Sequence, residues 1–465
     1  MSNLFKYLPS VDSVLNKLEE EGVIDGLPRA LSRDLVNGFL DVCREEIKGG
    51  IITEEKQLSS ENIFPRLACH VRAGAKPHFR RVLNATGVVV HTNLGRSLLA
   101  ESAVKAVTEA CACYSNLEFD LKTGERGSRY SHVEKLICEI TGAEAALVVN
   151  NNASAVLITL ETLAKGREAV VSRGQLVEIG GSFRIPDVMT KSGAVLREVG
   201  ATNRTHLHDY ENAINEETAL LMKVHTSNFR VIGFTKEVSG GELAELGRKY
   251  ELPVYEDLGS GNLTNFSGLG LMREPTVQEV VAEGVDVVSF SGDKVLGGPQ
   301  AGIIVGSKKY IDMIKKNPLN RAVRIDKMTL AALEATLRLY LDPETAMREV
   351  PTVRMITEKP ENLKAQAQSL ARVMRRVLGE KVIIGVREGV SRVGGGAFPE
   401  QDLKTFLVTV VPQNNISVEL LKERLLSTEP PLVARIELDA FCLDPRTLSR
   451  EEYKLAAETV SQALG

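Results

Sequence analysis

The sequence predicts an α/β protein with a mostly parallel β-sheet in its large domain, preceded by a small helical domain and followed by a smaller α+β domain. Two observations predict this class. Between residues 82 and 325, short apolar runs alternate with helical stretches, which is typical of parallel strands covered on both faces. The segments on either side change pattern, to helical periodicity before this range and to mixed helix and strand after it. We therefore predict domains at 1–64, 82–325 and 326–465, with a basic connector at 65–81.

The N-terminal domain is predicted from apolar residues at helical spacing. The first helix follows Pro9 and Ser10, and the second ends at Gly49. Their apolar faces comprise Val11, Val14, Leu15 and Leu18, then Leu31, Leu35, Phe39, Val42 and Ile47. The connector carries five basic and no acidic residues (Arg66, Arg72, Lys76, Arg80 and Arg81). Charge alone is compatible with a phosphate-facing surface and equally with a solvated linker.

The large domain is predicted from seven apolar runs, each short enough to be a strand. They are residues 145–149, 169–171, 194–196, 220–224, 253–256, 285–289 and 301–305. A helical stretch at 153–164 follows the first run, and a long one at 329–341 opens the C-terminal domain. Runs at 381–384 and 405–411 predict the strands of that domain.

Composition excludes some classes of protein. The chain has 465 residues and a net charge of −4, and it contains no apolar stretch of the roughly 20 residues that a membrane span needs. Its N-terminus lacks the pattern of a signal peptide. The six cysteines show no C-x-x-C spacing, so we expect reduced thiols in a cytoplasmic protein with no membrane partner.

Polar residues follow three of the predicted strands. Asn152, Ala153 and Ser154 open the helix after residue 149, where backbone amides and the helix dipole favour a phosphate. Asp257 lies at the tip of the strand that begins at Pro253. Ser291 and Lys294 follow the strand at 285–289. Because ligands of open α/β sheets bind at the carboxyl ends of the strands, we expect these groups to form one site.

Together these residues match the needs of pyridoxal 5′-phosphate. Lys294 would form a Schiff base with the aldehyde and, once released, act as the base that removes a Cα proton. Asp257 would keep the pyridine nitrogen protonated. The helix start and Ser291 would hold the phosphate. The alternative to a catalytic role is that Lys294 is a structural lysine that caps a loop.

The sequence resembles the bacterial L-seryl-tRNA(Sec) selenium transferases (selenocysteine synthases), which have the aspartate-aminotransferase-like fold type I of pyridoxal-phosphate enzymes. The resemblance runs over nearly the whole chain. It includes NATGVVVHTNLGRSLL (84–99), YSNLEFDLKTGERGSRYSHVEKL (114–136), ALVVNNNASAVL (146–157), RGQLVEIGGSFRIPDVM (173–189), VYEDLGSG (254–261), SFSGDKVLGGPQAG (289–302) and NRAVRIDKMTLAALEATLRLYL (320–341). It implies a seven-stranded sheet, with Lys294 as the Schiff-base lysine and Asp257 as the partner of the pyridine nitrogen.

The resemblance also implies a reaction. The family converts L-seryl-tRNA(Sec) to L-selenocysteinyl-tRNA(Sec) through a cofactor-bound aminoacrylyl-tRNA, by eliminating water and then adding selenium from selenophosphate. Arg96, Arg321 and Arg324 are the implied selenophosphate site. Arg126 and Arg129 are further anion candidates that could reach a neighbouring subunit. The alternative for Arg321 and Arg324 is a solvated helix face or an ion pair with Asp326.

Three further expectations concern the cofactor ring, the RNA and the assembly. His225 and Asn228 are candidate cofactor contacts, although a histidine at a strand end is more often satisfied locally. The resemblance implies that the N-terminal domain docks the tRNA, yet residues 1–61 carry seven lysines and arginines against twelve acidic residues, so the domain could instead serve oligomerisation or packing. Sites of this fold usually lie at dimer interfaces, and the family implies a ring of dimers.

Two other functions compete with this interpretation. One is a pyridoxal-phosphate lyase of the same fold that acts on a small amino acid or an amino sugar. The other is a tRNA-binding protein without catalysis, against which Lys294 and Asp257 both argue.

Overall fold

The computed structural model describes residues 4–179, 183–226, 229, 231–269, 271–413 and 416–465. The chain forms two compact units, residues 1–81 and 82–465.

The first unit is a small helical bundle. It contains η1 (Leu4–Tyr7), α1 (Val11–Glu20), α2 (Arg29–Lys48), η2 (Glu55–Leu58) and α3 (Ser60–Gly74). Ser10 caps α1 by accepting from the Ser13 N–H at 3.3 Å. The three α-helices share one apolar core, in which Leu18, Val36 and Val71 are fully buried.

The predicted connector at 65–81 is wrong in its first part, because that part belongs to helix α3. Residues 65–74 belong to this helix because Leu67, Ala68 and Val71 continue its apolar face into the core. Arg66 forms an ion pair with Glu46 at 2.7 Å, so its charge is already matched within the unit. The division between the units lies after Arg81 rather than at residue 64.

A seven-stranded sheet forms the centre of the second unit, in the order β2-β10-β9-β8-β7-β3-β6. Its strands are β2 (Ala145–Val149), β3 (Glu168–Ser172), β6 (Val195–Val199), β7 (Thr218–Val224), β8 (Val254–Gly259), β9 (Val287–Ser291) and β10 (Gly302–Gly306). Strand β10 runs antiparallel to both β2 and β9, and the other pairs of neighbours are parallel. Each of the seven predicted apolar runs overlaps a strand that begins within two residues of the expected position, which confirms the predicted sheet.

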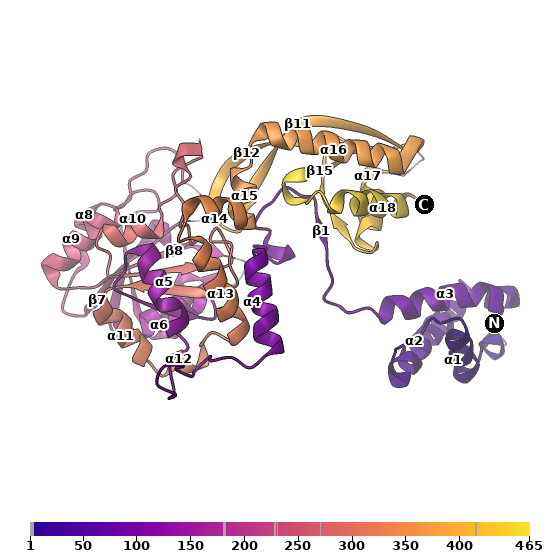
Figure 1. Cartoon of the computed structure of the whole chain (residues 1–465), viewed down its shortest axis with the longest axis horizontal. Helices are drawn as coiled ribbons and strands as arrows, with labels where there is room; N and C mark the ends of the chain where they lie inside the picture. The colour runs from indigo at the N-terminus through magenta and orange to yellow at the C-terminus, as the bar shows by residue number, and fades with distance from the viewer. Residues whose placement is uncertain (1–3, 180–182, 227–228, 230, 270, 414–415) are drawn as a thin grey trace. The chain divides into compact units, whose positions relative to one another are not determined.

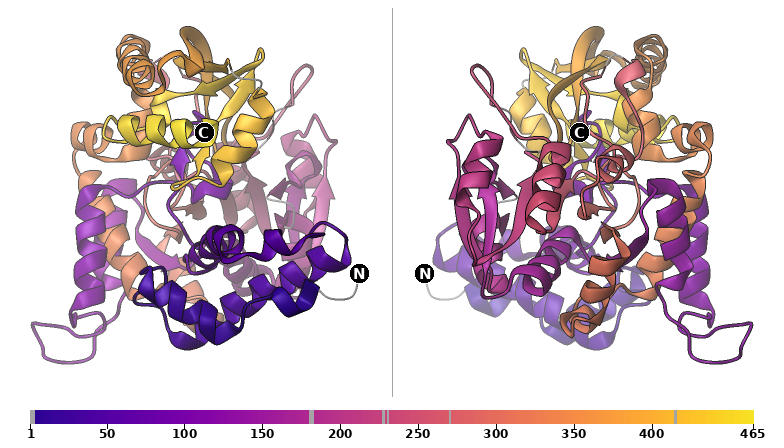
Figure 2. Two further views of the ribbon diagram at one scale, coloured as in Figure 1. Left: turned by 90° about the vertical axis from the view of Figure 1, so that its right-hand side faces the viewer. Right: turned by 90° about the vertical axis from the view of Figure 1, so that its left-hand side faces the viewer.

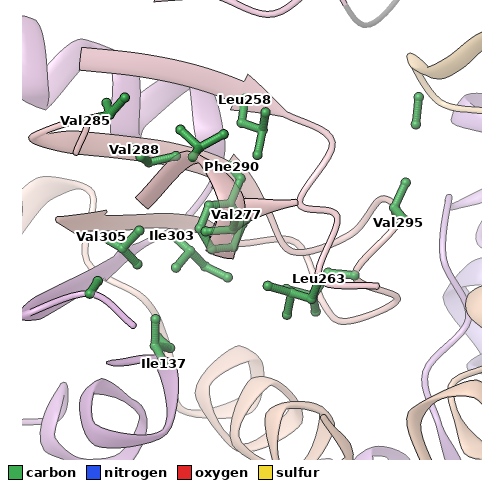
Figure 3. Close-up of a cluster of buried hydrophobic side chains, with 14 of the residues drawn as sticks. Ile137, Leu258, Leu263, Val277, Val285, Val288, Phe290, Val295, Ile303 and Val305 are labelled. Carbon is green, nitrogen blue, oxygen red and sulfur yellow. The ribbon is translucent and has the colours of Figure 1, made fainter. Parts of the chain in front are cut away.

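Helices cover both faces of this sheet, because successive strand residues point to opposite sides. One face packs on α6 (Asn152–Ala164), α7 (Ile185–Ser192) and α11 (Lys308–Lys316), and includes Leu147, Val149 and Tyr255. The other face includes Ala146 and Val148. It packs on α5 (Ser131–Thr141), α8 (Leu207–Ala213), α9 (Gly240–Tyr250), α10 (Val277–Ala282) and α13 (Lys327–Leu339). Figure 3 shows Val288, Ile303 and Val305 of β9 and β10 in this second core.

The helices after the sheet stay with the large core. The apolar side chains of α13, α14 (Pro343–Glu349) and α15 (Pro351–Thr357) pack with those of β9 and β10. The predicted domain boundary at 325/326 therefore lies too early, because the helices that follow it pack in the core of the large sheet. Helices α4 (Glu101–Ala112) and α12 (Leu319–Ala322) also belong to the second unit.

The C-terminal part contains a four-stranded antiparallel sheet, in the order β11-β12-β15-β14. Its strands are β11 (Val382–Gly394), β12 (Ala397–Pro412), β14 (Arg435–Glu437) and β15 (Ala440–Leu443). Helix α16 (Pro360–Leu378) lies along this sheet with α17 (Val418–Leu426) and α18 (Glu452–Leu464) nearby (Figure 1). The short strands β1 (Leu83–Asn84) and β13 (Leu432–Val433) pair in parallel, and β4 (Glu178–Ile179) pairs with β5 (Phe183–Arg184).

Candidate functional site

The site is built on the sheet face that α6 covers. Asp257 in β8 and Ser289 in β9 point to this face because they alternate in phase with Tyr255 and Val287 of the same core. Asn152, the first residue of α6, donates from Nδ2 to Asp257 Oδ1 at 2.8 Å. The Ser289 hydroxyl donates to the same oxygen at 3.3 Å. The acid at the tip of β8 is thus held by a helix start and by the next strand.

Lys294 lies in the turn that follows β9 and is 6% exposed. Its backbone is fixed by Ser97, whose hydroxyl donates to the carbonyl oxygens of Asp293 at 2.9 Å and of Lys294 at 2.6 Å. The Gly297 N–H closes the turn on the Lys294 carbonyl at 3.0 Å. Gly297 has φ +73°, a backbone conformation that favours glycine. The turn therefore presents one amine from a constrained backbone.

Burial shifts the pKa values of both principal groups toward their neutral forms. The pKa of Lys294 is lowered mainly by burial, which favours the free amine, while Asp257 opposes the shift. Burial also raises the pKa of Asp257, against hydrogen bonds from Asn152 and Ser289 and the charge of Lys294. A cation beside Asp257 would restore its ionised form. The protonated nitrogen of a pyridine ring is such a cation.

Helix α6 begins at Asn152, whose side chain contacts Asp257. The backbone amides of its first turn are the candidate phosphate donors. Asn151 caps the helix by accepting from the Ser154 N–H at 2.9 Å, and the first intrahelical bond runs from the Ala155 N–H. The amides of Asn152 and Ala153 therefore precede the helical ladder, which makes this end a suitable phosphate seat. A Cβ on Gly302 of β10 would come 2.1 Å from the Asn151 carbonyl oxygen, so the close approach requires glycine.

The other predicted cofactor residues lie at the same strand ends. Ser291 is buried at the end of β9. The His225 N–H donates to the Asp257 carbonyl at 2.9 Å. Burial, followed by the charges of Lys223 and Lys294, lowers the pKa of His225 to about 4, so the imidazole is neutral at physiological pH. Asn228 lies outside the described residues.

The residues present fit pyridoxal phosphate. Three buried polar atoms near Lys294 and Asp257 make no hydrogen bond of normal geometry among the described residues: Asn152 Oδ1, Ser260 Oγ and Glu274 Oε1. The Ser260 hydroxyl lies close enough to Glu274 to lower the pKa of that carboxyl, which leaves Asn152 Oδ1 as the atom with no neighbouring partner. Such atoms are expected where a polar ligand completes the hydrogen bonding. The amine of Lys294, the carboxyl of Asp257 and the amides of α6 then supply an aldehyde partner, a pyridinium partner and a phosphate seat.

The predicted anion site is only partly brought together. Arg321 and Arg324 line one pocket of about 430 Å³. Arg96 does not line it; the Arg96 Nη1 instead contacts Asp293 Oδ2 at 2.7 Å, beside Lys294. Within one chain, the three arginines therefore form two groups.

The arginine pocket also contains the two further candidates, Arg126 and Arg129. Glu118 faces three of the four guanidinium groups: it forms an ion pair with Arg129 and lies 3.3 Å from Arg126 and 3.7 Å from Arg324. Arg129 is buried and also donates to the Ile325 carbonyl at 2.6 Å, which makes it structural. The pocket therefore carries an excess of positive charge.

The alternative for Arg321 and Arg324 was an ion pair with Asp326, and the described residues do not form that ion pair. Asp326 instead caps α13 by accepting from the Met328 N–H at 2.8 Å and the Thr329 N–H at 3.0 Å.

Four residues of the site were not predicted from the sequence. Ser97 holds the backbone of the turn that contains Lys294, and Asp293 forms an ion pair with Arg96. Ser289 donates to Asp257, and Glu274 faces His225. Asp293 and Ser289 stand within the quoted motif around Lys294, so their position in the sequence was a usable signal. Ser97 follows the predicted Arg96 within the quoted motif at 84–99, so it had the same signal, whereas Glu274 lies in no quoted motif and only the tertiary structure identifies it.

Two family models match this chain, one in each unit. Residues 82–449 match the model described as L-seryl-tRNA selenium transferase. Residues 5–44 match the model described as selenocysteine synthase N terminal.

Comparison with known proteins gives relatives over the full length. The chain is 91% identical over 464 residues to an L-seryl-tRNA(Sec) selenium transferase of Maridesulfovibrio salexigens, with 100% of both chains covered. It is 54% identical to that of Geobacter sulfurreducens, with 96% of each chain covered. Among solved structures, a D-glucosaminate-6-phosphate ammonia-lyase shares the fold, with a TM-score of 0.57, 21% identity, and coverage of 83% of this chain and 96% of that one. The chain is therefore an enzyme that belongs to the L-seryl-tRNA selenium transferase family.

Proposed function

We propose that this enzyme converts L-seryl-tRNA(Sec) to L-selenocysteinyl-tRNA(Sec), with selenophosphate as the selenium donor and pyridoxal phosphate on Lys294. The observation that carries the proposal is the buried amine of Lys294 beside the buried carboxyl of Asp257, in a chain 91% identical to a relative named for this transfer. The lyase alternative is disfavoured because the ammonia-lyase is only 21% identical. The non-catalytic alternative leaves this pair of groups without a use.

The proposed roles of the cofactor residues follow from their surroundings. When bound, pyridoxal phosphate draws electron density from the seryl Cα and makes its proton acidic. The Lys294 Nζ takes that proton, which burial allows because it favours the neutral amine. Asp257, held by Asn152, would bind the ring nitrogen, and the amides of Asn152 and Ala153, with Ser154 and Ser291, would hold the phosphate. The neutral imidazole of His225 would contact the ring, and Asn228 remains a proposed contact.

The arginine pocket is the proposed binding site for selenophosphate. Arg324 lies 3.7 Å from Glu118, a carboxylate that is shared with Arg126 and Arg129, and Arg321 lines the same pocket. A phosphate-like anion suits such a cluster because guanidinium groups can bind it in a bidentate manner. Arg96 would join this site from the lysine side or from a neighbouring subunit.

An exposed apolar surface supports a homo-oligomer. The proposed unit is a dimer, and the proposed larger assembly is a ring of dimers. Figure 2 shows the segment after α4 extending away from the helices as a loop. In this region Tyr114, Phe119 and Leu121 are exposed, and they line a groove of about 680 Å³ beside α13. Exposed apolar patches of this kind mark protein interfaces. A second copy of the chain is the proposed occupant.

The N-terminal unit is proposed to dock the tRNA. Its separate apolar core supports an independent role, and its match to the N-terminal family model supports a role shared by the family. The excess of acidic residues favours recognition of RNA shape over general attraction to phosphate. Six free thiols support the predicted cytoplasmic location, and no helix among the described residues is long and apolar enough to cross a membrane.

The decisive experiment supplies the purified protein with pyridoxal phosphate, selenophosphate and either seryl-tRNA(Sec) or seryl-tRNA(Ser). We expect selenocysteine on tRNA(Sec) alone. We also expect an imine absorbance band and a borohydride-fixed cofactor adduct in the wild type, both absent from Lys294→Ala and retained in the exposed-lysine control Lys308→Ala. Absence of the adduct from the wild type would refute the catalytic proposal. Equal conversion of the two tRNAs would refute selective docking.

A further inference from the structure

Glu274 is a buried carboxyl group that the proposed roles above leave unused. It lies in the segment between β8 and α10, and its side chain is only 4% exposed. Its Oε2 accepts from the Phe398 N–H of β12 at 2.9 Å. Its Oε1 is buried without a hydrogen-bond partner among the described residues. One oxygen therefore anchors the side chain. The carboxyl also has the Ser260 hydroxyl close enough to lower its pKa, and Ser260 Oγ is itself buried without another partner among the described residues.

The second oxygen, Oε1, lies in the cofactor site. His225 Nε2 is 4.0 Å from Oε1, beyond hydrogen-bond distance. Glu274 and Lys294 also lie close enough for each to alter the pKa of the other. Burial raises the pKa of Glu274, which favours the protonated carboxyl.

The reaction needs a proton donor at the seryl oxygen because hydroxide is a poor leaving group. Lys294 carries the Cα proton at that moment and is the competing donor, whereas the other neighbouring groups are poor donors. His225 is neutral at physiological pH, and Asp257 is engaged with Asn152 and Ser289. Asp293 forms an ion pair with Arg96. Glu256 is also buried, but it forms an ion pair with Lys223 at 2.7 Å, so Glu274 is the buried acid that remains near Lys294.

We propose that Glu274 is the general acid of the elimination, donating its proton to the departing β-hydroxyl of the seryl group. This inference rests on the proposed function. The Cα–H bond breaks and its proton passes to the Lys294 Nζ, while its electron pair forms the Cα=Cβ bond. The Cβ–O bond breaks with its pair on oxygen, which takes the Glu274 proton and leaves as water. Lys294 later returns its proton to Cα, and Glu274 regains one from solvent.

The test uses Glu274→Gln, which retains an oxygen that can accept from the Phe398 N–H but has no acidic proton. In cofactor-free protein, infrared difference spectra should show the carbonyl stretch of a protonated carboxylic acid in the wild type and its loss in E274Q. In the loaded enzyme, E274Q should still exchange the seryl Cα hydrogen with deuterated solvent. Its loss of the β-hydroxyl should fall by at least about a hundredfold. Glu279→Gln, in the adjacent helix α10, is the matched control and should resemble the wild type in both measurements.

Other outcomes overturn the inference in recognisable ways. An unchanged rate of hydroxyl loss in E274Q would assign the acid role to Lys294, which can return the proton it has taken. An equal fall in exchange and elimination would make Glu274 a structural tether of β12. Glu274→Asp guards against misfolding of E274Q, because it should retain the infrared band and part of the elimination rate. A wild-type enzyme that neither exchanges nor eliminates would refute the proposed function itself.

Discussion

The side chain of Asn152 donates to the Asp257 carboxylate at 2.8 Å and so joins the start of α6 to the end of β8. Asn152 also supplies one of the first-turn amides of α6. The same residue thus sets the position of the proposed phosphate seat relative to the proposed partner of the ring nitrogen.

Replacing Asn152 with alanine should weaken cofactor binding. The change leaves a buried carboxylate short of one donor, and the loss of a hydrogen bond to a charged group corresponds to a dissociation constant raised by about tenfold. Titration of the cofactor-free protein with pyridoxal phosphate, followed by absorbance, measures this constant. The exposed control Asn362→Ala should bind as the wild type does, and equal affinity of N152A would remove Asn152 from the site.

Replacing Asp257 with asparagine should separate cofactor binding from protein stability. Burial raises the pKa of Asp257, so at pH 8 the ionised carboxyl opposes folding of the cofactor-free protein, and the neutral amide should leave the free energy of unfolding unchanged or higher. Product formation should fall by at least about a hundredfold, because the ring nitrogen loses its counter-charge. Urea unfolding and a turnover assay measure the two effects. A destabilised D257N with normal turnover would assign Asp257 a purely structural role.

His225 should make the cofactor-free protein less stable in mild acid. Its folded-state pKa is about 4, below the ordinary 6.5, so between these values the unfolded chain binds a proton that the folded chain does not. Its contribution to stability is therefore complete above pH 6.5 and declines as the pH falls toward 4, by about 2 kcal/mol at pH 5.

Urea unfolding at pH 7.5 and pH 5 measures that decline. Glu274 is the carboxyl that faces the imidazole, and Lys223 and Lys294 are the nearby cations, so their titration is common to the wild type and the variant. His225→Gln should lose less stability than the wild type between the two pH values. Identical losses would show that the imidazole is protonated in the folded state at pH 5.

Replacing Arg324 or Arg321 with alanine should raise the KM for selenophosphate by about tenfold or more, since each removes a charge-assisted contact to the anion. Cofactor absorbance should remain unchanged because neither residue contacts Asp257 or Asn152. Arg348→Ala, which removes an exposed arginine paired with Glu349, is the control. A normal KM in both pocket variants would place the anion elsewhere.

The sheet, and the position of Asp257 and Lys294 at the ends of its strands, could be predicted because local patterns specify them. Buried strands require continuous apolar runs such as Ala145–Val149, and the polar residues that follow them lie at the same edge of the sheet. Asp257 and Lys294 were identified from this rule and from the quoted motifs.

The remaining contacts depend on tertiary structure. Glu274 meets the Phe398 N–H across 124 positions of sequence, and no periodicity marks either residue. Arg66 was assigned to a connector because its charge was conspicuous, whereas the apolar spacing of Leu67 and Val71 places it in a helix, and its partner Glu46 comes from another helix. The boundary at 325/326 failed for a related reason: an amphipathic helix such as α13 does not reveal in its own sequence which of two cores it covers.

The position of β10 has a consequence for biosynthesis. Strand β2 is the first strand of the large sheet to leave the ribosome, yet among the described residues its pairing partner is β10, the last to be made. A nascent chain that ends before residue 302 therefore holds five apolar residues with an unsatisfied backbone edge. Such an edge invites aggregation or a chaperone until translation has passed the sheet.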